Sequence, residues 1–406
     1  MIDFSIFLGG KNRIVLPFLL YPLLFVAPSL ILSSIIIIPN DRLPGFLKQL
    51  LSIPLLLAVF FIPFGFTNGN RIIDLVAGVT NYNIFLRFLE LYWVGPLIQD
   101  RPVYATPLSL WIDFWSSLRT FPKKGKPVKI YKKDKKFYHI ILNFLICAFI
   151  LDIFGSWICS FTGYEAVAMI KEKPITYFFF FAACIVVMTA GFNLAGYILQ
   201  FMYCVFVEHG SYSSEQWNSL MRHPIVSHSL DDLWSYRWHQ LFKTTWLAFP
   251  FRPVRILTQR ALAKRVSNDT SRSVAFLLAS ISVFFASAFM HEYIVAANLG
   301  WPIFNRYFKG QQCIFFISHG VGAFFENLIK LYVAPRLSPQ FKNSLACRVI
   351  QHTWTILFGY FTFYYIMNGF LSWGFHFDNP CQLTKPFVAK FVYAHPRLHS
   401  YFGSQI

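Results

Sequence analysis

The fold class is indicated first by one segment, which reads SVAFLLASISVFFASAFMHEYIVAANL from Ser273 to Leu299. About 20 apolar residues cross the hydrocarbon core of a bilayer as a helix, so this segment predicts a transmembrane span. His291 is an ionisable residue inside it. Such residues are costly in a membrane and usually face a bundle interior or a water-filled cavity. We therefore take His291 as a candidate functional residue, the alternative being a histidine that hydrogen-bonds a neighbouring helix.

A polar stripe runs along this predicted helix. At about 100° per residue, Ser280, Ser287, His291 and Asn298 fall within roughly 40° of one another. Ser287 lies one turn before His291, where it can orient the imidazole or pack against another helix. Glu292 points about 100° away from His291, so we expect no dyad between these two side chains.

Composition indicates an integral membrane protein with many spans. The chain has 406 residues, of which 56% are hydrophobic and only 13% are charged, about half the charged share of a soluble domain. The net charge of +18 raises the possibility of nucleic-acid binding. We reject that interpretation because the charge lies in loops between apolar runs, without any nucleic-acid-binding motif. Seven scattered cysteines predict neither a disulfide framework nor a metal site.

The apolar runs predict an all-α, polytopic transmembrane helix bundle of about eight spans, with seven to ten allowed. Charged residues interrupt the third run, and the fifth is long enough to form one tilted helix or a broken pair. The first run follows Lys11 and Arg13 and exceeds the core of a signal peptide, so we expect a retained span. The runs are 14–38, 49–66, 72–98, 139–160, 174–207, 273–299, 312–335 and 349–373. No soluble domain boundary is visible between them, so we expect a single integral-membrane domain over 1–406.

Loop charge predicts which side of the membrane each loop faces. With a lumenal N-terminus, the loops 39–48, 99–138, 208–272 and 336–348 face the cytosol and carry most of the 36 lysines and arginines. Within the second of these loops, the lysine-rich segment 122–136 is typical of a solvated stretch attracted to anionic headgroups. A second interpretation is a surface that receives a phosphate-bearing donor.

The loop 208–272 contains the second informative motif, PIVSHSLDDLWSYRWHQ, from Pro224 to Gln240. Ser229 is a good N-cap, and Asp231 and Asp232 suit the first turn of a helix. The residues expected to share an apolar face are Leu230, Leu233, Trp234, Trp238 and Leu241. We therefore predict an amphipathic helix at the membrane interface, and by spacing alone it needs no chemical role.

Taken together, the two motifs resemble the wax-synthase-like branch of the membrane-bound O-acyltransferase superfamily. The resemblance rests on SLDDLWSYRWH at 229–239 and on an intramembrane histidine, His291, about fifty residues later. The segment Phe316–Gly320 with Glu326 is similar to the family's next helix, so the resemblance covers a core region at 224–326. The chain departs from the branch at Leu233, Ser235 and Tyr236, and has His239 where the superfamily often has asparagine.

The resemblance implies transfer of an acyl group from acyl-CoA, or acetyl-CoA, to a hydroxyl group. A hydroxyl is a weak nucleophile near neutral pH and needs a base, a role that a neutral, buried His291 suits. Negative charge that develops on the thioester oxygen needs hydrogen-bond donors. Candidate donors are His239, Trp238 and Arg237. We favour His239, which can instead orient the donor thioester.

Other residues are expected to surround the reaction. Coenzyme A phosphates would meet basic residues near the cytosolic mouth, and the candidates for donor binding are Arg237, Trp238, Lys243, Arg252 and Arg255. Trp234, Ser287, Asn298 and His319 are candidates for lining a substrate tunnel, although His319 can equally be a packing residue. We predict an i,i+4 pair between Glu326 and Lys330. We expect His223, His228 and His352 to be solvated near the interface.

Several alternatives remain open from the sequence. A polytopic transporter or proton-coupled carrier could use His291 and His319 as relay groups, and a non-catalytic relative could keep the fold alone. The acceptor could be a long-chain alcohol, diacylglycerol, a sterol or a terpenoid alcohol, as in secondary metabolism. The partners implied are membrane lipids and acyl-CoA, in a multi-pass protein expected in the endoplasmic reticulum. The sequence lacks a Gly-x-Ser-x-Gly elbow, a Walker loop and a dinucleotide fingerprint.

Overall fold

The computed structural model describes residues 8–121, 137–210 and 216–405 and confirms the all-α architecture. Within these residues, the strands are limited to β1 (Ile14–Val15) and β2 (Phe66–Thr67), which pair in parallel. Seven helices of the described chain are long and apolar enough to cross a membrane. The lysine-rich segment 122–136, for which we predicted headgroup or donor binding, lies outside the described residues.

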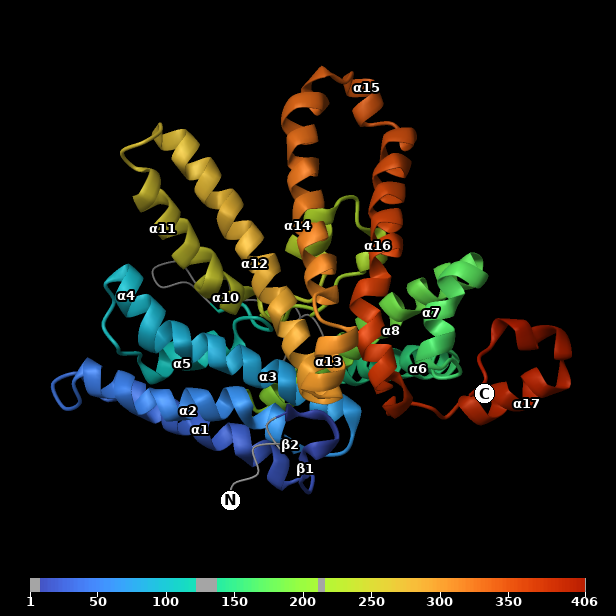
Figure 1. The fold of residues 1–406 in the computed structure, drawn as a ribbon, viewed down its shortest axis with the longest axis horizontal. Coiled ribbons are helices and arrows are strands. Elements are labelled where there is room, and N and C mark those ends of the chain that lie inside the picture. The colour runs from blue at the N-terminus through green and yellow to red at the C-terminus, as the bar shows by residue number, and fades with distance from the viewer. Residues whose placement is uncertain (1–7, 122–136, 211–215, 406) are drawn as a thin grey trace. The chain divides into compact units, whose positions relative to one another are not determined.

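The chain divides into two compact units, which are drawn with their helices labelled in Figure 1. Unit 1 comprises residues 1–113 and 242–324, and unit 2 comprises residues 114–241 and 325–406. Helix α14 (Gln311–Leu328) runs from the first set of residues into the second. The single acyltransferase domain expected over 1–406 stays a prediction, as does the core region at 224–326.

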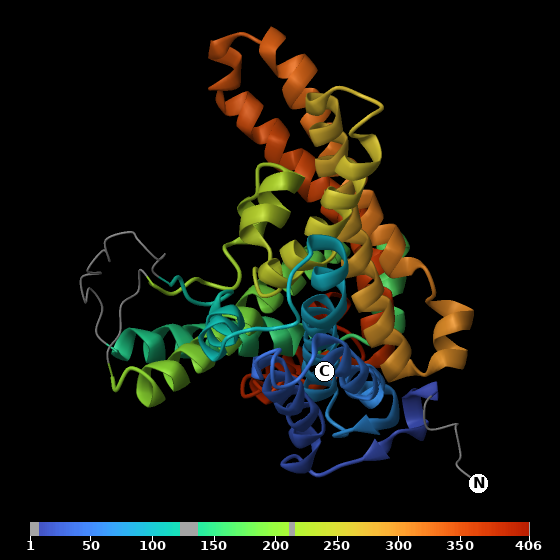
Figure 2. The ribbon, with the colours of Figure 1, turned by 90° about the vertical axis from the view of Figure 1, so that its left-hand side faces the viewer.

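Unit 1 contains both the first spans and the helix that carries His291. Helix α12 packs against α11 and α3, and Figure 2 shows the yellow α11 and α12 side by side. Apolar side chains from the first helices form one core cluster, which includes Leu32, Ile36, Leu56 and Tyr92. The helices of this unit are α1 (Leu20–Ile37), α2 (Gly45–Gly65), α3 (Arg71–Leu89), α4 (Gly95–Gln99), α5 (Pro107–Trp115, which ends just inside unit 2), α10 (Lys243–Trp246), α11 (Arg252–Leu262), α12 (Asn268–Leu299) and α13 (Trp301–Tyr307).

The charged third run forms one membrane-length helix, as predicted. Helix α3 continues through a π-helical turn (Glu90–Val94) into α4, giving a candidate span at Arg71–Gln99. Glu90 is fully buried and forms ion pairs with Arg87, at 2.5 Å, and with Arg101. These pairs explain how the charges fit in this helix, because buried charges inside membranes are accommodated by partners of opposite sign.

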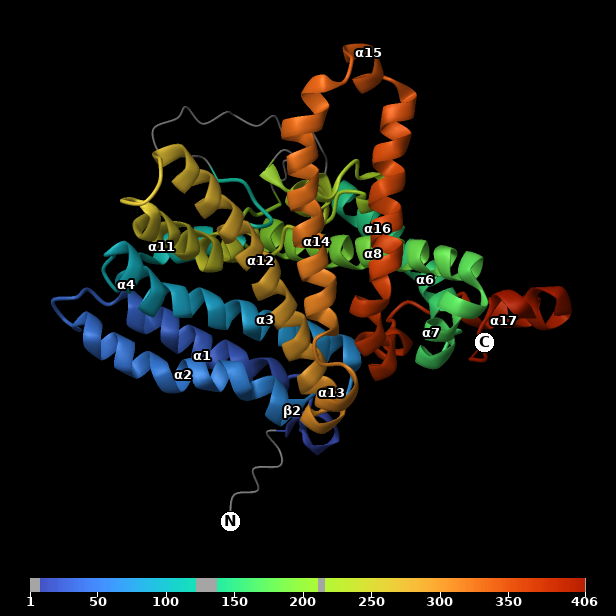
Figure 3. The ribbon, with the colours of Figure 1, turned by 45° about the horizontal axis from the view of Figure 1, so that its top comes forward.

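Unit 2 is built around a long helix, α8, which shows whether the fifth apolar run forms one helix or two. The fifth apolar run forms a single continuous helix of 33 residues, and α6 lies beside it (Figure 3). The eighth run forms α16, whose tyrosines and Asn368 lower its hydropathy, and it is not among the seven candidate spans. The remaining helices of the unit are α6 (Tyr138–Ile158), α7 (Gly163–Glu172), α8 (Pro174–Phe206), α9 (Leu230–Asp232), α15 (Pro339–Lys342), α16 (Leu345–Trp373) and α17 (Lys385–Ala394).

Candidate functional site

His291 lies in the second half of α12, in unit 1. Ser267 caps the start of this helix, and Gly300 ends it with a φ of 86°, a conformation that glycine adopts without strain. The His291 side chain is half-buried, and its ring packs on the buried ring of Phe316 in α14, with 4.8 Å between ring centroids. Ser287 is half-buried one turn earlier. The His291 imidazole therefore packs against the neighbouring helix α14 within unit 1, and its role as a base stays a prediction.

Two other residues of the predicted polar stripe donate hydrogen bonds to backbone oxygens within α12 itself. The Ser280 hydroxyl donates to the backbone oxygen of Phe276 at 2.9 Å, and the buried Asn298 amide donates to that of Ile294 at 2.8 Å. Local bonds of this kind are common for polar residues in apolar helices. They give Ser280 and Asn298 a role in the helix, whereas the proposed tunnel role of Asn298 remains a prediction.

Glu292 has a structural role that the sequence analysis missed. Its Oε1 accepts backbone hydrogen bonds from Gln312, at 3.1 Å, and from Cys313, at 3.3 Å, at the beginning of α14. A carboxylate at a helix N-terminus satisfies exposed N–H groups and interacts favourably with the helix dipole. The residue next to His291 thus ties α12 to the helix whose Phe316 packs on the imidazole.

His319 lies in α14 and is almost completely buried. Its Nδ1 is 2.8 Å from the backbone oxygen of Phe315, one turn earlier, and the two rings are in contact at 4.2 Å. Because a carbonyl oxygen only accepts hydrogen bonds, Nδ1 carries the hydrogen. This arrangement favours the packing interpretation of His319.

The second motif folds differently from the predicted helix. Ser229 caps α9 by accepting a hydrogen bond from the Asp232 backbone at 3.0 Å, as predicted. The helix then widens into a π-helical turn over Leu233–Arg237 and ends, because Trp238 adopts an extended conformation. The prediction that the helix continues through Trp238 to Leu241 is therefore wrong, and the residues from Trp238 to Leu241 lie outside any helix.

Glu326 anchors the start of this segment, which corrects the predicted Glu326–Lys330 pair. Glu326 is buried and accepts backbone hydrogen bonds from Leu230, at 2.8 Å, and Asp231, at 3.3 Å, and one from the Trp354 indole, at 2.8 Å. Lys330 forms an ion pair with Asp231 at 3.5 Å instead. Helical spacing could not reveal this arrangement because the partners come from α9 and α16.

Arg237 and the two tryptophans of the motif are held within the same segment. The Arg237 guanidinium donates to Asp232 at 2.6 Å, so this arginine has an acidic partner inside the motif. The Trp234 and Trp238 rings are in contact, with centroids 5.4 Å apart. These contacts make the motif a compact aromatic and charged turn.

His239 follows this turn and stacks on an aromatic ring of α8. Its ring lies 4.9 Å from that of Phe192, with the planes inclined by only 19°. Burial lowers the pKa of His239 from 6.5 to about 4, because the charged form loses its hydration. The imidazole is therefore neutral at physiological pH, with one nitrogen as donor and the other as acceptor.

The basic candidates for donor binding lie at two helix starts of unit 1. Lys243 begins α10 and Arg252 begins α11, and both are exposed, as is Arg255. Helix α11 is strongly amphipathic, with its three arginines on one side. The sequence analysis placed the amphipathic helix at 229–241 and did not identify this one.

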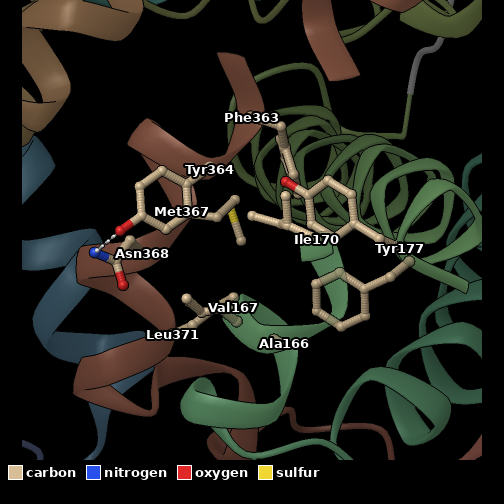
Figure 4. A pocket seen from close by; sticks show the side chains of 10 residues that line it. Ala166, Val167, Ile170, Tyr177, Phe363, Tyr364, Met367, Asn368 and Leu371 are labelled. Carbon is tan, nitrogen blue, oxygen red and sulfur yellow. Dashed lines mark hydrogen bonds between the residues drawn. The ribbon is translucent and has the colours of Figure 1, made fainter. Parts of the chain in front are cut away.

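A small apolar pocket lies in unit 2 among α7, α8 and α16 (Figure 4). Tyr177 is one of its lining residues, and the Asn368 amide donates to the Tyr364 hydroxyl at 3.3 Å on one wall. Apart from these groups, apolar side chains such as Ile170 and Met367 form its lining. None of the candidate site residues lines this pocket, so it gives no support to the predicted tunnel.

The segment that carries both motifs also has a match among protein families. Residues 217–318 match the membrane bound O-acyl transferase family. The matched segment covers roughly a quarter of the chain and includes both His239 and His291. No curated protein matches the chain. Together with the seven apolar helices, the match supports an integral, multi-pass membrane acyltransferase.

Proposed function

We propose that this protein is an acyl-CoA-dependent O-acyltransferase that esterifies the hydroxyl group of a lipid-soluble alcohol. The observation that carries the proposal is the family match over residues 217–318, which contain His291 within a helix of membrane-spanning length. A base set among apolar helices suits an acceptor that enters from the bilayer. It also keeps bulk water away from a thioester that water would hydrolyse.

His291 acts as the general base in this proposal. It takes the proton from the acceptor hydroxyl as the oxygen attacks the carbonyl carbon of the thioester. The carbon–sulfur bond of the tetrahedral intermediate then breaks. The coenzyme A thiolate leaves and takes up the proton from His291, giving an ester and free coenzyme A. Such general-base help is typically worth about 10²–10⁴-fold in rate.

His239 acts as the second functional residue, through its neutral imidazole. A ring that stays neutral down to a pKa of about 4 has a fixed N–H donor at every physiological pH. That donor can stabilise the developing oxyanion or orient the thioester. Trp238 adds an indole N–H, whereas Arg237 is engaged with Asp232 and serves to hold the turn.

The substrates follow from these roles. Lys243, Arg252 and Arg255, which are exposed, are the proposed contacts for the coenzyme A phosphates. Trp234, Ser287, Asn298 and His319 remain the proposed lining of the acceptor tunnel. We favour a long-chain, sterol or terpenoid alcohol as the acceptor, in a reaction of the kind that the wax-synthase-like branch carries out. We propose that the protein resides in the endoplasmic reticulum.

Microsomes that contain the protein provide the test. Radiolabelled acyl-CoA is supplied with a panel of lipid alcohols, and labelled ester is separated from free acid. Wild-type protein should form ester with at least one alcohol, and His291→Ala should reduce that rate by about 10²-fold or more. His395→Ala serves as the control, because that histidine is exposed and has no place in the proposed reaction. Undiminished turnover by His291→Ala at equal expression would remove the base assignment.

A further inference from the structure

Two histidines that are far apart in the sequence meet in unit 2. His228 precedes α9, His352 lies in the second turn of α16, and their ring centroids are only 4.1 Å apart with the planes inclined by 46°. His228 is exposed and His352 is half-buried. The pair is therefore accessible from outside the unit and takes no part in the proposed reaction.

The hydrogen bonds of the pair leave its coordinating nitrogens available. His352 Nδ1 is 2.9 Å from the backbone oxygen of Ser227, so Nδ1 carries the hydrogen and Nε2 keeps its lone pair. Histidines that bind metals commonly donate the other ring N–H to a carbonyl in this way, which fixes the tautomer and the ring orientation. His228 is held by its backbone N–H, which donates to Asp232 at 3.2 Å. Among the described residues, its ring contacts His352 and makes no hydrogen bond.

We propose that His228 and His352 form a binding site for a late first-row divalent cation, with Zn²⁺ as the best fit. Imidazole nitrogens suit Zn²⁺, Cu²⁺ and Ni²⁺ and are poor ligands for Mg²⁺ or Ca²⁺. Zinc–nitrogen bonds of about 2.0–2.1 Å in tetrahedral geometry place two imidazole centroids about 5 Å apart. The rings therefore need to separate by about 1 Å, which the exposed His228 side chain can provide. Water completes the coordination, since the described residues contain no cluster of three or more metal-binding side chains.

A bound ion would fasten the segment before α9 to α16. The Leu230 backbone that follows this segment already donates to Glu326, which also accepts from the Trp354 indole of α16, and the chain then leads to the turn before His239. The ion would reinforce the hydrogen bond from His352 to the Ser227 backbone, which already joins this segment to α16. Zinc should therefore stabilise unit 2 by mass action, whether or not acyl transfer is measured.

Calorimetric titration of the full-length, detergent-purified and metal-stripped protein with ZnCl₂ tests the site. We expect one Zn²⁺ per chain with micromolar affinity, and at least an approximately tenfold loss in both His228→Gln and His352→Gln, because each removes one of two protein ligands. His223→Gln is the matched control, since His223 is exposed five residues before His228 and should leave the affinity unchanged. Zinc binding that is unchanged in both variants, or undetectable in wild-type protein, would overturn the proposal.

A measurement on the wild-type protein covers the case in which the variants fail to fold. Diethylpyrocarbonate modifies accessible imidazole nitrogens, and mass spectrometry of the peptides reports each histidine separately. Zinc should protect His228 and leave His223 fully reactive. Equal protection of both histidines, or of neither, would show that the pair is only a contact between two rings.

Discussion

Removing the Glu326 carboxylate should destabilise the segment that leads to His239. This buried carboxylate accepts three hydrogen bonds, from the backbones of Leu230 and Asp231 and from the Trp354 indole. Hydrogen bonds to a charged group contribute about 1.5–3 kcal/mol each, but not additively. We expect Glu326→Ala to lower the free energy of unfolding by about 3 kcal/mol. Glu326→Gln, which keeps one acceptor oxygen, should cost about half as much.

Thermal denaturation in detergent measures this effect through the midpoint temperature. For a unit of about 200 residues, a loss of about 3 kcal/mol corresponds to a fall of roughly 6–12 °C. Asn327→Ala is the control, because Asn327 is the next residue along and is exposed. If Glu326→Ala and Asn327→Ala lower the midpoint equally, the carboxylate does not anchor the segment and our reasoning is refuted.

Three further predictions follow from buried polar groups. Because burial lowers the pKa of His239 from 6.5 to about 4, the unfolded chain binds a proton between these pH values and the folded chain does not. The free energy of unfolding should therefore fall by about 3 kcal/mol as the pH drops from about 6.5 to 4. His239→Asn should flatten this part of the curve of midpoint temperature against pH. Glu292→Ala removes the acceptor at the start of α14 and should cost about 1–2 kcal/mol in the same assay, whereas an unchanged midpoint would show that the cap is dispensable. Asn81 is fully buried, and neither polar atom of its side chain has a hydrogen-bond partner among the described residues. Asn81→Leu should therefore maintain or raise the midpoint temperature of denaturation. A clear fall in that temperature would show that the Asn81 amide has a hydrogen-bond partner.

Periodicity predicted the membrane helices well because apolar length is a local property. The run at 273–299 became α12, and the charged third run became one span once Arg87 and Arg101 paired with Glu90. The fifth run was left open between one helix and two, because hydropathy alone cannot say whether a long apolar stretch bends. The structure resolves it as the single helix α8.

The second motif could be predicted only in part, because its shape depends on distant partners. Ser229 signalled the N-cap correctly, since capping involves neighbours three residues away. The anchor at Glu326 depends on α14 and α16, and the chain around the end of the helix bonds to the backbones of Leu220 and Arg222. Spacing within 224–240 contains none of these contacts. The contact between His228 and His352 could not be predicted from spacing either, because the two residues are more than a hundred positions apart in the sequence.

Mass spectrometry of lipid extracts from a host that produces this chain tests the central claim most directly. Cells with the wild-type protein should accumulate a new lipid ester, whose mass equals that of the alcohol plus that of the fatty acid minus water. Cells with His291→Ala, at equal protein level, should lack this ester. A profile that stays unchanged with the wild-type protein across all alcohols supplied, or the same ester in equal amount with His291→Ala, would contradict the account.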